Sequence, residues 1–237
     1  MEPNSVFIAM QERFKTSTKT RILAFGSSNT QRFLPGMHWF DVFELAIDNT
    51  FLQTHQGKTH FCINAGICGN STTDLLKRFD EDAALYQPHL VFITIGGNDS
   101  IHKMPEAEFE SNLRELHRRF NAKGCAVVFQ TYYSPDPSRT DDLALFYRFM
   151  DIIRKVAKST GAGLVDHLRR WELFRKAYPE LYLKMMHDCF HVKCYGNMLM
   201  GLDIGRHFGA TVSRDTDPAG FWDESLRIQK LIDNLEK

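Results

Sequence analysis

The chain has 237 residues, and its hydrophobic content of 43% is sufficient for a large core, which favours a single α/β domain. Lysine plus arginine and aspartate plus glutamate number 29 each, so no net charge would recruit nucleic acid or an anionic membrane. The five cysteines are an odd number without a C-x-x-C pair, which argues against a disulfide framework and against a cysteine zinc site. We therefore expect reduced thiols and a small-molecule partner.

The first residues do not resemble a signal peptide, because no basic segment precedes a long apolar one. No apolar run in the sequence approaches the length of a membrane span. Together with the reduced thiols, these features predict a cytoplasmic location without a membrane span. The sequence does not predict an oligomeric state.

Apolar runs alternate with helical patterns in the first half of the chain. Around residues 39–47 the apolar side chains recur at spacings of three and four, as in a helix that packs on a sheet. In chain order we expect an amphipathic helix at 6–14, a strand at 22–25, a helix at 39–47, a strand at 60–63, a helix from about 72 to 86 and a strand at 90–95. The last run is the most continuously apolar one, which is typical of a strand buried on both faces. His38 is interpreted as a surface residue in the first turn of its helix.

The second half continues the alternation. Pro105 and the acidic residues that follow it are typical of a helix start, and Gly124 is typical of a helix end. In chain order we expect a helix from 105 to about 122, a strand at 126–129, a proline-interrupted loop at 134–137, a helix at 141–158, a strand at 163–166, a helix at 167–177, a helix that begins near 195 and a terminal helix at 222–237.

Strands separated by helices, five times over, predict βαβ units and a mostly parallel sheet in a three-layer α/β/α sandwich. We expect one domain, with residues 1–20 as an N-terminal extension, 21–208 as the core and 209–237 as a helical tail. In such sheets ligands bind beyond the carboxyl ends of the strands, where the strand order reverses. Three polar, glycine-containing loops follow predicted strands and are expected at that edge, namely residues 26–30, 64–72 and 96–99.

The first of these loops, of sequence GSSNT, places small polar residues directly after an apolar run. A serine can attack when its Oγ projects from a tight turn beside a base and beside N–H groups that receive an oxyanion, so Ser27 or Ser28 is a candidate nucleophile. Late in the chain, Asp188 precedes His191 by three residues. On a turn, this carboxylate can reach imidazole Nδ1 and leave Nε2 free to accept the serine proton.

Four blocks, in this order and spacing, resemble the SGNH hydrolases, the superfamily of GDSL-type esterases and lipases. Residues 26–30 are similar to its G-D-S-x-T nucleophile block, 64–69 to its second glycine block, 96–99 to its G-x-N-D block and 188–191 to its D-x-x-H block. The similarity covers roughly residues 21–208. It implies a flavodoxin-like, five-stranded parallel sheet, no cofactor or metal, and hydrolysis of an acyl ester through an acyl-serine intermediate.

The resemblance also implies a role for each residue that matches a motif. Ser28 would be the nucleophile, His191 the general base and then the general acid, and Asp188 the residue that orients the imidazole. The oxyanion would be bound by the backbone N–H groups of Ser28 and Gly69 and by the side-chain amide of Asn98.

Two positions depart from the family pattern. Ser27 stands where aspartate is usual, and Val192 stands where proline often follows the histidine. The aspartate is not a member of the triad, so its replacement concerns the bracing of the loop more than the reaction. It also leaves two adjacent hydroxyls, and we assign Ser28 as the nucleophile because it aligns with the family serine.

Other interpretations of these residues remain open at this point. In one alternative, His191 is a structural residue and His187 is the base. In another, Asn98 only caps a helix. His187, Asp188 and His191 would together be ligands in a metal-dependent hydrolase. A member of the fold that binds its ligand without cleaving it is the non-enzymatic alternative.

Two cysteines that flank the predicted site, Cys68 and Cys189, are interpreted as small packing residues.

The substrate is predicted only as a class. Four aromatic residues near the loops are candidates for a sugar platform or for the wall of an acyl groove. They are Trp39, Tyr132, Tyr133 and Phe190. The absence of an obvious lid favours a small acyl group, such as acetyl, on a carbohydrate or similar alcohol, with a lysophospholipase or thioesterase-like acyl hydrolase as the alternative.

Overall fold

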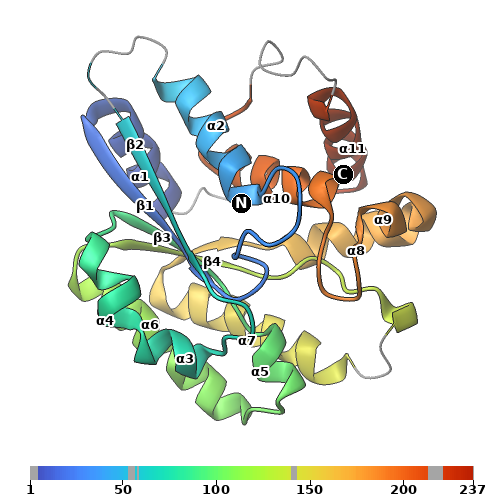
Figure 1. The fold of residues 1–237 in the computed structure, drawn as a ribbon, viewed down its shortest axis with the longest axis horizontal. Helices are drawn as coiled ribbons and strands as arrows, with labels where there is room; N and C mark the ends of the chain where they lie inside the picture. The colour runs from blue at the N-terminus through green and yellow to red at the C-terminus, as the bar shows by residue number, and fades with distance from the viewer. Residues whose placement is uncertain (1–4, 53–56, 58, 140–142, 213–220, 237) are drawn as a thin grey trace.

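The computed structural model describes residues 5–52, 57, 59–139, 143–212 and 221–236. Its centre is a parallel sheet of five strands in the order β2-β1-β3-β4-β5 (Figure 1). The strands are β1 (Lys19–Gly26), β2 (Thr59–Gly66), β3 (Leu90–Thr94), β4 (Ala126–Gln130) and β5 (Gly163–Val165). This is the flavodoxin-like order, so the predicted sheet is confirmed.

Helices cover both faces of the sheet, as predicted, because its side chains alternate between two apolar cores. Leu90 and Phe92 of β3 face one helical layer, whereas Val91 and Ile93 face the other. The first layer consists mainly of α1 (Ser5–Thr16), α2 (Trp39–Phe51), α8 (His167–Ala177), α9 (Pro179–Met185), α10 (Cys194–His207) and α11 (Phe221–Leu235). The second layer consists mainly of α3 (Thr72–Lys77), α4 (Phe79–Asp82), α6 (Glu106–Ala122) and α7 (Ala144–Thr160). The three-layer sandwich is therefore confirmed.

The register of the sheet brings the predicted loops to one edge. Gly26 at the end of β1 is paired with Gly66 of β2 and with Thr94 of β3, and Thr94 is paired with Gln130 of β4. The chain moves outward in one direction from β1 to β2 and then in the other from β3, so the strand order reverses between β1 and β3. A crevice outside the carboxyl ends of these strands is where this architecture binds ligands.

The continuous helix predicted from about residue 72 to 86 is wrong. The segment consists of α3, α4 and a single 3₁₀ turn, Ala84–Tyr86, and the chain bends between α3 and α4 at Arg78. The Arg78 guanidinium donates hydrogen bonds to the carbonyls of Gly26 (3.0 Å) and Ala65 (2.9 Å) at the ends of β1 and β2. Arg78, at the bend, thus binds the ends of the two strands from which the first two loops begin.

Two short helices were not expected, α5 (Gly97–Ile101) and α9. A proline at the first position of α9 is a recognisable helix start, whereas α5 is too short for a periodic pattern. The predicted start of the helix at 141–158 lies partly outside the described residues, and α7 is described from Ala144.

His38 is buried, so its interpretation as a surface residue is wrong. Its Nδ1 accepts a hydrogen bond from the Phe40 N–H, and Asp41 accepts one from the His38 N–H, which makes a capping box at the start of α2. The other ring nitrogen lies 3.3 Å from the Asn29 carbonyl of the first loop. Burial, partly opposed by this carbonyl, lowers the pKa of His38 to about 4, so the ring is neutral at pH 7.

Candidate active site

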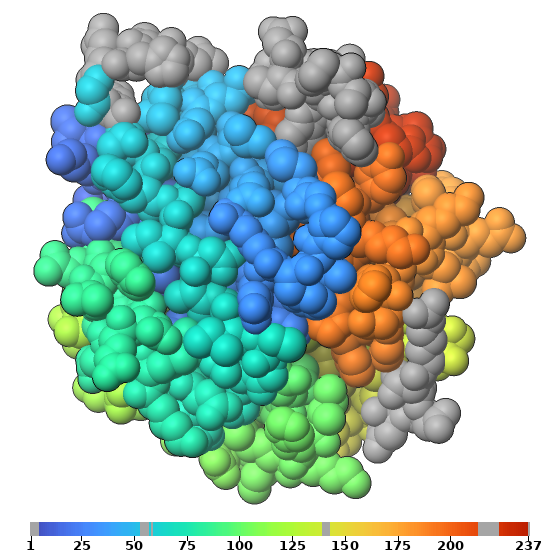
Figure 2. Space-filling model, viewed as in Figure 1, coloured from blue at the N-terminus to red at the C-terminus, as the bar shows by residue number. Residues whose placement is uncertain are grey.

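The loop after β1 forms a tight turn that presents Ser28. The Ser27 carbonyl accepts hydrogen bonds from the N–H groups of Thr30 and Gln31, both at 3.0 Å. Gly26 allows this turn, because a Cβ there would lie 2.4 Å from the Thr94 carbonyl oxygen. In Figure 2 the blue segment that follows β1 lies directly beside the orange segment that leads into α10.

The two segments meet in a chain of hydrogen bonds. Ser28 Oγ lies 2.8 Å from His191 Nε2, and His191 Nδ1 lies 2.8 and 2.9 Å from the two carboxylate oxygens of Asp188. The structure therefore brings together the three residues predicted to form the triad. The ring that reaches Ser28 is that of His191, whereas the His187 N–H donates to the His191 carbonyl and helps to close the turn.

The turn from Asp188 to His191 is held by its own backbone. Asp188 Oδ1 accepts hydrogen bonds from the N–H groups of Phe190 and His191, both at 2.8 Å. Burial alone would raise the pKa of Asp188, but these hydrogen bonds and the His191 ring lower it below its usual value. An ionised carboxylate on Nδ1 keeps the proton of a neutral imidazole on that nitrogen and leaves Nε2 as an acceptor for the Ser28 hydroxyl.

The neighbouring hydroxyl points elsewhere. Ser27 is fully buried, and its Oγ lies 3.2 Å from the hydroxyl of Tyr132, which is also buried. Burial raises the pKa of Tyr132, so its hydroxyl stays protonated. Of the two adjacent serines, the one beside a base is Ser28.

Three candidate hydrogen-bond donors lie on the segments that follow β1, β2 and β3. Gly69 has a positive φ of 82°, and within the described residues neither its N–H nor that of Ser28 donates to a protein acceptor. Asn98 Nδ2 donates one hydrogen bond, 2.9 Å long, to the Asn70 carbonyl next to Gly69. A primary amide has two N–H donors, so the second one is left for a ligand.

A family model for GDSL-like lipases and acylhydrolases matches residues 24–197. The chain belongs to the GDSL-like lipase/acylhydrolase family. As such it is a carboxylic-ester hydrolase of the SGNH type, as the sequence blocks predicted.

Individual relatives agree with this assignment. The chain is 26% identical over 162 residues to an acetylxylan esterase of Geobacillus stearothermophilus, an alignment that covers 62% of this chain and 71% of that protein. It is 32% identical over 73 residues to the esterase TesA of Pseudomonas aeruginosa, covering 31% and 36% of the two chains. The crystal structure of Axe2, an acetylxylan esterase from Geobacillus stearothermophilus, superposes with a TM-score of 0.69 and 19% identity over 84% of this chain and 99% of that chain, which supports the fold.

Two residues of this GDSL-family chain hold the loops at the strand ends in place, and the sequence did not predict their roles. Arg78 binds the ends of β1 and β2, as described above, and its guanidinium lies over the Phe25 ring at 4.4 Å. Asp99, the last residue of the G-x-N-D block, is buried and accepts hydrogen bonds from the Thr72 N–H (2.8 Å) and hydroxyl (2.6 Å). A carboxylate often accepts a hydrogen bond from a backbone N–H at the start of a helix, as Asp99 does from Thr72. The sequence, however, does not show which helix Asp99 will contact.

The prediction that four aromatic residues wall the substrate site is wrong for three of them. Trp39, Tyr132 and Tyr133 are buried, with at most 2% of their surface exposed. They serve the nucleophile loop instead, because Trp39 Nε1 donates to the Asn29 carbonyl (2.8 Å) and the Tyr133 hydroxyl donates to Asn29 Oδ1 (2.6 Å). Only Phe190 is partly exposed and lines a hollow.

Two hollows are lined by residues from the segments that carry the triad of this GDSL-family site. A small one is formed by Ser28 and His191 together with Phe33, Leu34 and Met37 from the segment before α2. Phe33 contacts the His191 ring edge-on, with 5.3 Å between ring centroids. The second hollow, of about 380 Å³, lies beside Phe190 and the end of α5.

Within the described residues, no group of three histidine, cysteine, aspartate or glutamate side chains has the geometry of a metal site. The same part of the chain contains no helix that is both long and apolar enough to cross a bilayer.

Proposed function

We propose that this esterase hydrolyses esters of a small acyl group, acetyl or another short chain, on a carbohydrate or similar alcohol. The observation that carries the proposal is the hydrogen-bonded chain from Ser28 Oγ through His191 to Asp188. The acetylxylan esterases among the relatives and similar structures support the choice of a small acyl group.

The reaction begins when Ser28 Oγ attacks the ester carbonyl carbon and its proton passes to His191 Nε2. The imidazolium that forms is stabilised by the Asp188 carboxylate on Nδ1. The carbonyl oxygen becomes an oxyanion, for which the N–H groups of Ser28 and Gly69 and the amide of Asn98 are the available donors.

The tetrahedral intermediate then collapses. The bond to the alcohol oxygen breaks, His191 Nε2 returns its proton to that oxygen, and an acyl-serine remains on Ser28. Water attacks the acyl carbon while His191 accepts its proton, and the same proton is then given to Ser28 Oγ as the carboxylic acid leaves.

Labelling with a fluorophosphonate and turnover of p-nitrophenyl acetate test this mechanism. We expect S28A to abolish both the label and the turnover, and S27A to retain the label, because the Ser27 hydroxyl faces Tyr132. If S28A kept full activity while S27A lost it, the assignment of the nucleophile would be wrong. Failure of the wild-type protein in both assays would favour a member of the fold that only binds its ligand.

The acyl group is tested by a series of p-nitrophenyl esters of increasing chain length, together with acetylated sugars. We expect kcat/KM to be highest for the shortest acyl chains. An optimum at long chains would instead support the lysophospholipase or thioesterase-like alternative.

A further inference from the structure

The larger of the two hollows is lined by residues from two segments that carry candidate reacting groups. Its lining includes Ile101, which follows Asn98 by three residues in α5, and one turn of helix spans only about 5 Å. Its wall includes Phe190, which directly precedes His191. The same two segments that supply a candidate oxyanion donor and the base therefore also shape this pocket.

The pocket has the size and the surface to hold a ring. Its volume of about 380 Å³ is within the usual range for small-molecule sites, and an acetyl group would leave most of it empty. Phe146 and Phe190 lie together in the wall, with 5.6 Å between their ring centroids. Ile101 adds an apolar side chain that is 56% exposed at the rim. Such a wall suits the flat face of a cyclic alcohol.

The rim carries one unbalanced positive charge. Arg148 lines the pocket but is held by Glu106, with 2.7 Å between Arg148 Nε and the carboxylate. Lys103 also lines the pocket and is exposed, and none of the described carboxylates forms an ion pair with it. The net charge of these three groups is therefore that of the Lys103 ammonium.

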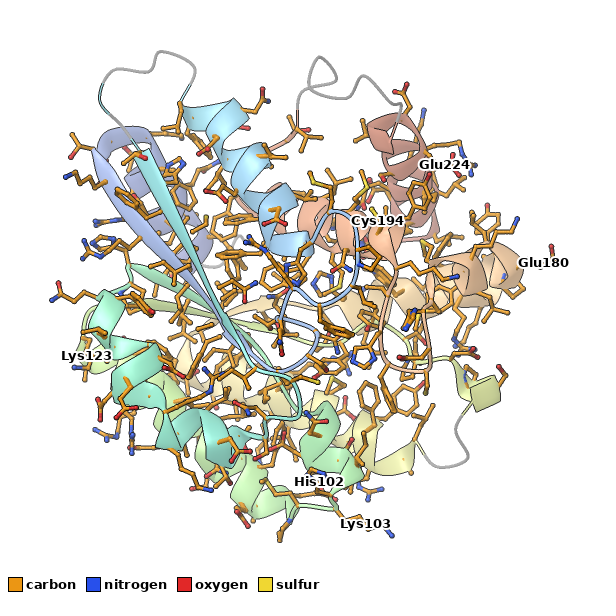
Figure 3. The ribbon with its side chains drawn as sticks, in the orientation of Figure 1. His102, Lys103, Lys123, Glu180, Cys194 and Glu224 are labelled. Atoms are coloured by element: carbon orange, nitrogen blue, oxygen red, sulfur yellow. The ribbon has the colours of Figure 1, made fainter. Side chains whose placement is uncertain are left out.

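The backbone holds Lys103 in this place. Its φ is +54°, a left-handed conformation that a residue with a side chain adopts at a cost. Hydrogen bonds on either side fix the turn, from the Lys103 N–H to the Ser100 carbonyl (3.1 Å) and from the Met104 N–H to the Asp99 carbonyl (2.9 Å). In Figure 3 Lys103 lies just beyond the end of α5, far from Lys123 across the molecule.

We propose that this pocket binds the alcohol part of the substrate, and that Lys103 pairs with a carboxylate on its ring. The preferred substrate class is then an acetyl or short-chain ester of a ring alcohol that carries a carboxylate, such as an acylated uronic acid or hydroxybenzoic acid. This inference rests on the proposed function, because a small acyl group leaves the pocket to the alcohol.

The test compares two esters of the same shape, 4-acetoxybenzoate and 4-acetoxybenzamide, which differ in the charge of one group. The measured quantity is the preference, the ratio of their kcat/KM values. We expect K103Q to lower this preference about fivefold, the upper range for an ion pair at a solvent-exposed rim. K103R should retain most of it, and added salt should reduce it in the wild type because an exposed pair is screened.

Lys123 provides the matched control, since it is an exposed lysine at the end of α6. K123Q should leave the preference unchanged. An unchanged preference in K103Q, or an equal loss in K123Q, would overturn the inference. Turnover of p-nitrophenyl acetate by the wild type distinguishes failure of the proposed function from failure of this inference. No turnover would contradict the proposed function. Turnover together with an unchanged preference in K103Q would contradict only the role of Lys103.

Discussion

The buried hydroxyls of Ser27 and Tyr132 are expected to stabilise the nucleophile loop by their interaction with each other. Ser27 occupies the position where the family usually has aspartate, and its Oγ has the Tyr132 hydroxyl as its partner at 3.2 Å. Both side chains are buried, so water cannot replace either partner. We therefore propose three variants, Y132F, S27A and the double variant, as a thermodynamic cycle.

The expected magnitudes follow from the burial of the two groups. Y132F keeps the ring and its packing but removes the hydroxyl that contacts Ser27, Asn29 and Gly97, and it leaves the Ser27 hydroxyl without a partner, so we expect it to cost about 1–3 kcal/mol of unfolding free energy. S27A leaves the Tyr132 hydroxyl with its contacts to Asn29 and Gly97, so its cost should be smaller, about 0.5–1.5 kcal/mol. The double variant leaves no unpaired hydroxyl at position 27. Its loss of unfolding free energy should therefore be smaller than the sum of the two single losses by about 1 kcal/mol.

Urea denaturation measures the cycle, with the midpoint shifting and the m-value unchanged. Y86F is the matched control, because Tyr86 is 40% exposed, and it should change stability by less than about 0.5 kcal/mol. We also expect Y132F to lower kcat/KM for p-nitrophenyl acetate, because the Ser28 N–H belongs to the loop that loses its support. Losses that add within about 0.3 kcal/mol would refute the interaction of the two hydroxyls.

Three further outcomes are expected. N98A should lower kcat by about a hundredfold to a thousandfold with a small effect on KM, as measured by steady-state kinetics, and an unchanged kcat would remove Asn98 from the oxyanion site. Because the pKa of His38 is lowered to about 4 in the fold, the unfolded chain binds a proton that the folded chain does not between about pH 6.5 and 4, so stability falls as the pH is lowered through this window. H38N should make the free energy of unfolding from urea denaturation less dependent on pH, by at most about 1.4 kcal/mol per pH unit, whereas an unchanged slope would show that His38 does not contribute. Treatment with EDTA should leave esterase activity intact, and a loss restored by added Zn²⁺ would support His187, Asp188 and His191 as metal ligands.

The elements of the site that are local in sequence could be predicted. The hydrogen bonds from the N–H groups of Phe190 and His191 and from the His191 ring to the Asp188 carboxylate span no more than three residues, so the D-x-x-H spacing predicts them. The sheet is also predictable, because each strand is an apolar run and the helices between strands require parallel pairing. The meeting of Ser28 with His191, 163 residues apart, came from the resemblance to a family and not from spacing.

The supporting residues could not be predicted, because their roles depend on tertiary contacts. Tyr132 and Tyr133 follow β4 as neighbours and belong to opposite apolar cores, so both are buried in a sheet covered on both faces. The sequence predicts helices on both faces of the sheet, but it does not show that this cover extends over the two residues that follow β4. Arg78 is similar, since a basic residue in a helical pattern is normally interpreted as solvent-exposed, whereas here it breaks the helix and binds two strand ends.

These supports explain how two adjacent serines acquire different roles. Ser28 Oγ meets a base, whereas Ser27 Oγ meets a buried phenol, so the second hydroxyl is available as a brace. Trp39 holds the carbonyl of Asn29, the next residue, and Tyr133 holds its side chain. If the Ser28 N–H binds the oxyanion, as we propose, a loop fixed from several elements holds this donor in place before substrate arrives, so it need not reorganise during the reaction. We therefore expect the Ser27–Tyr132 pair to brace the loop in place of the usual aspartate.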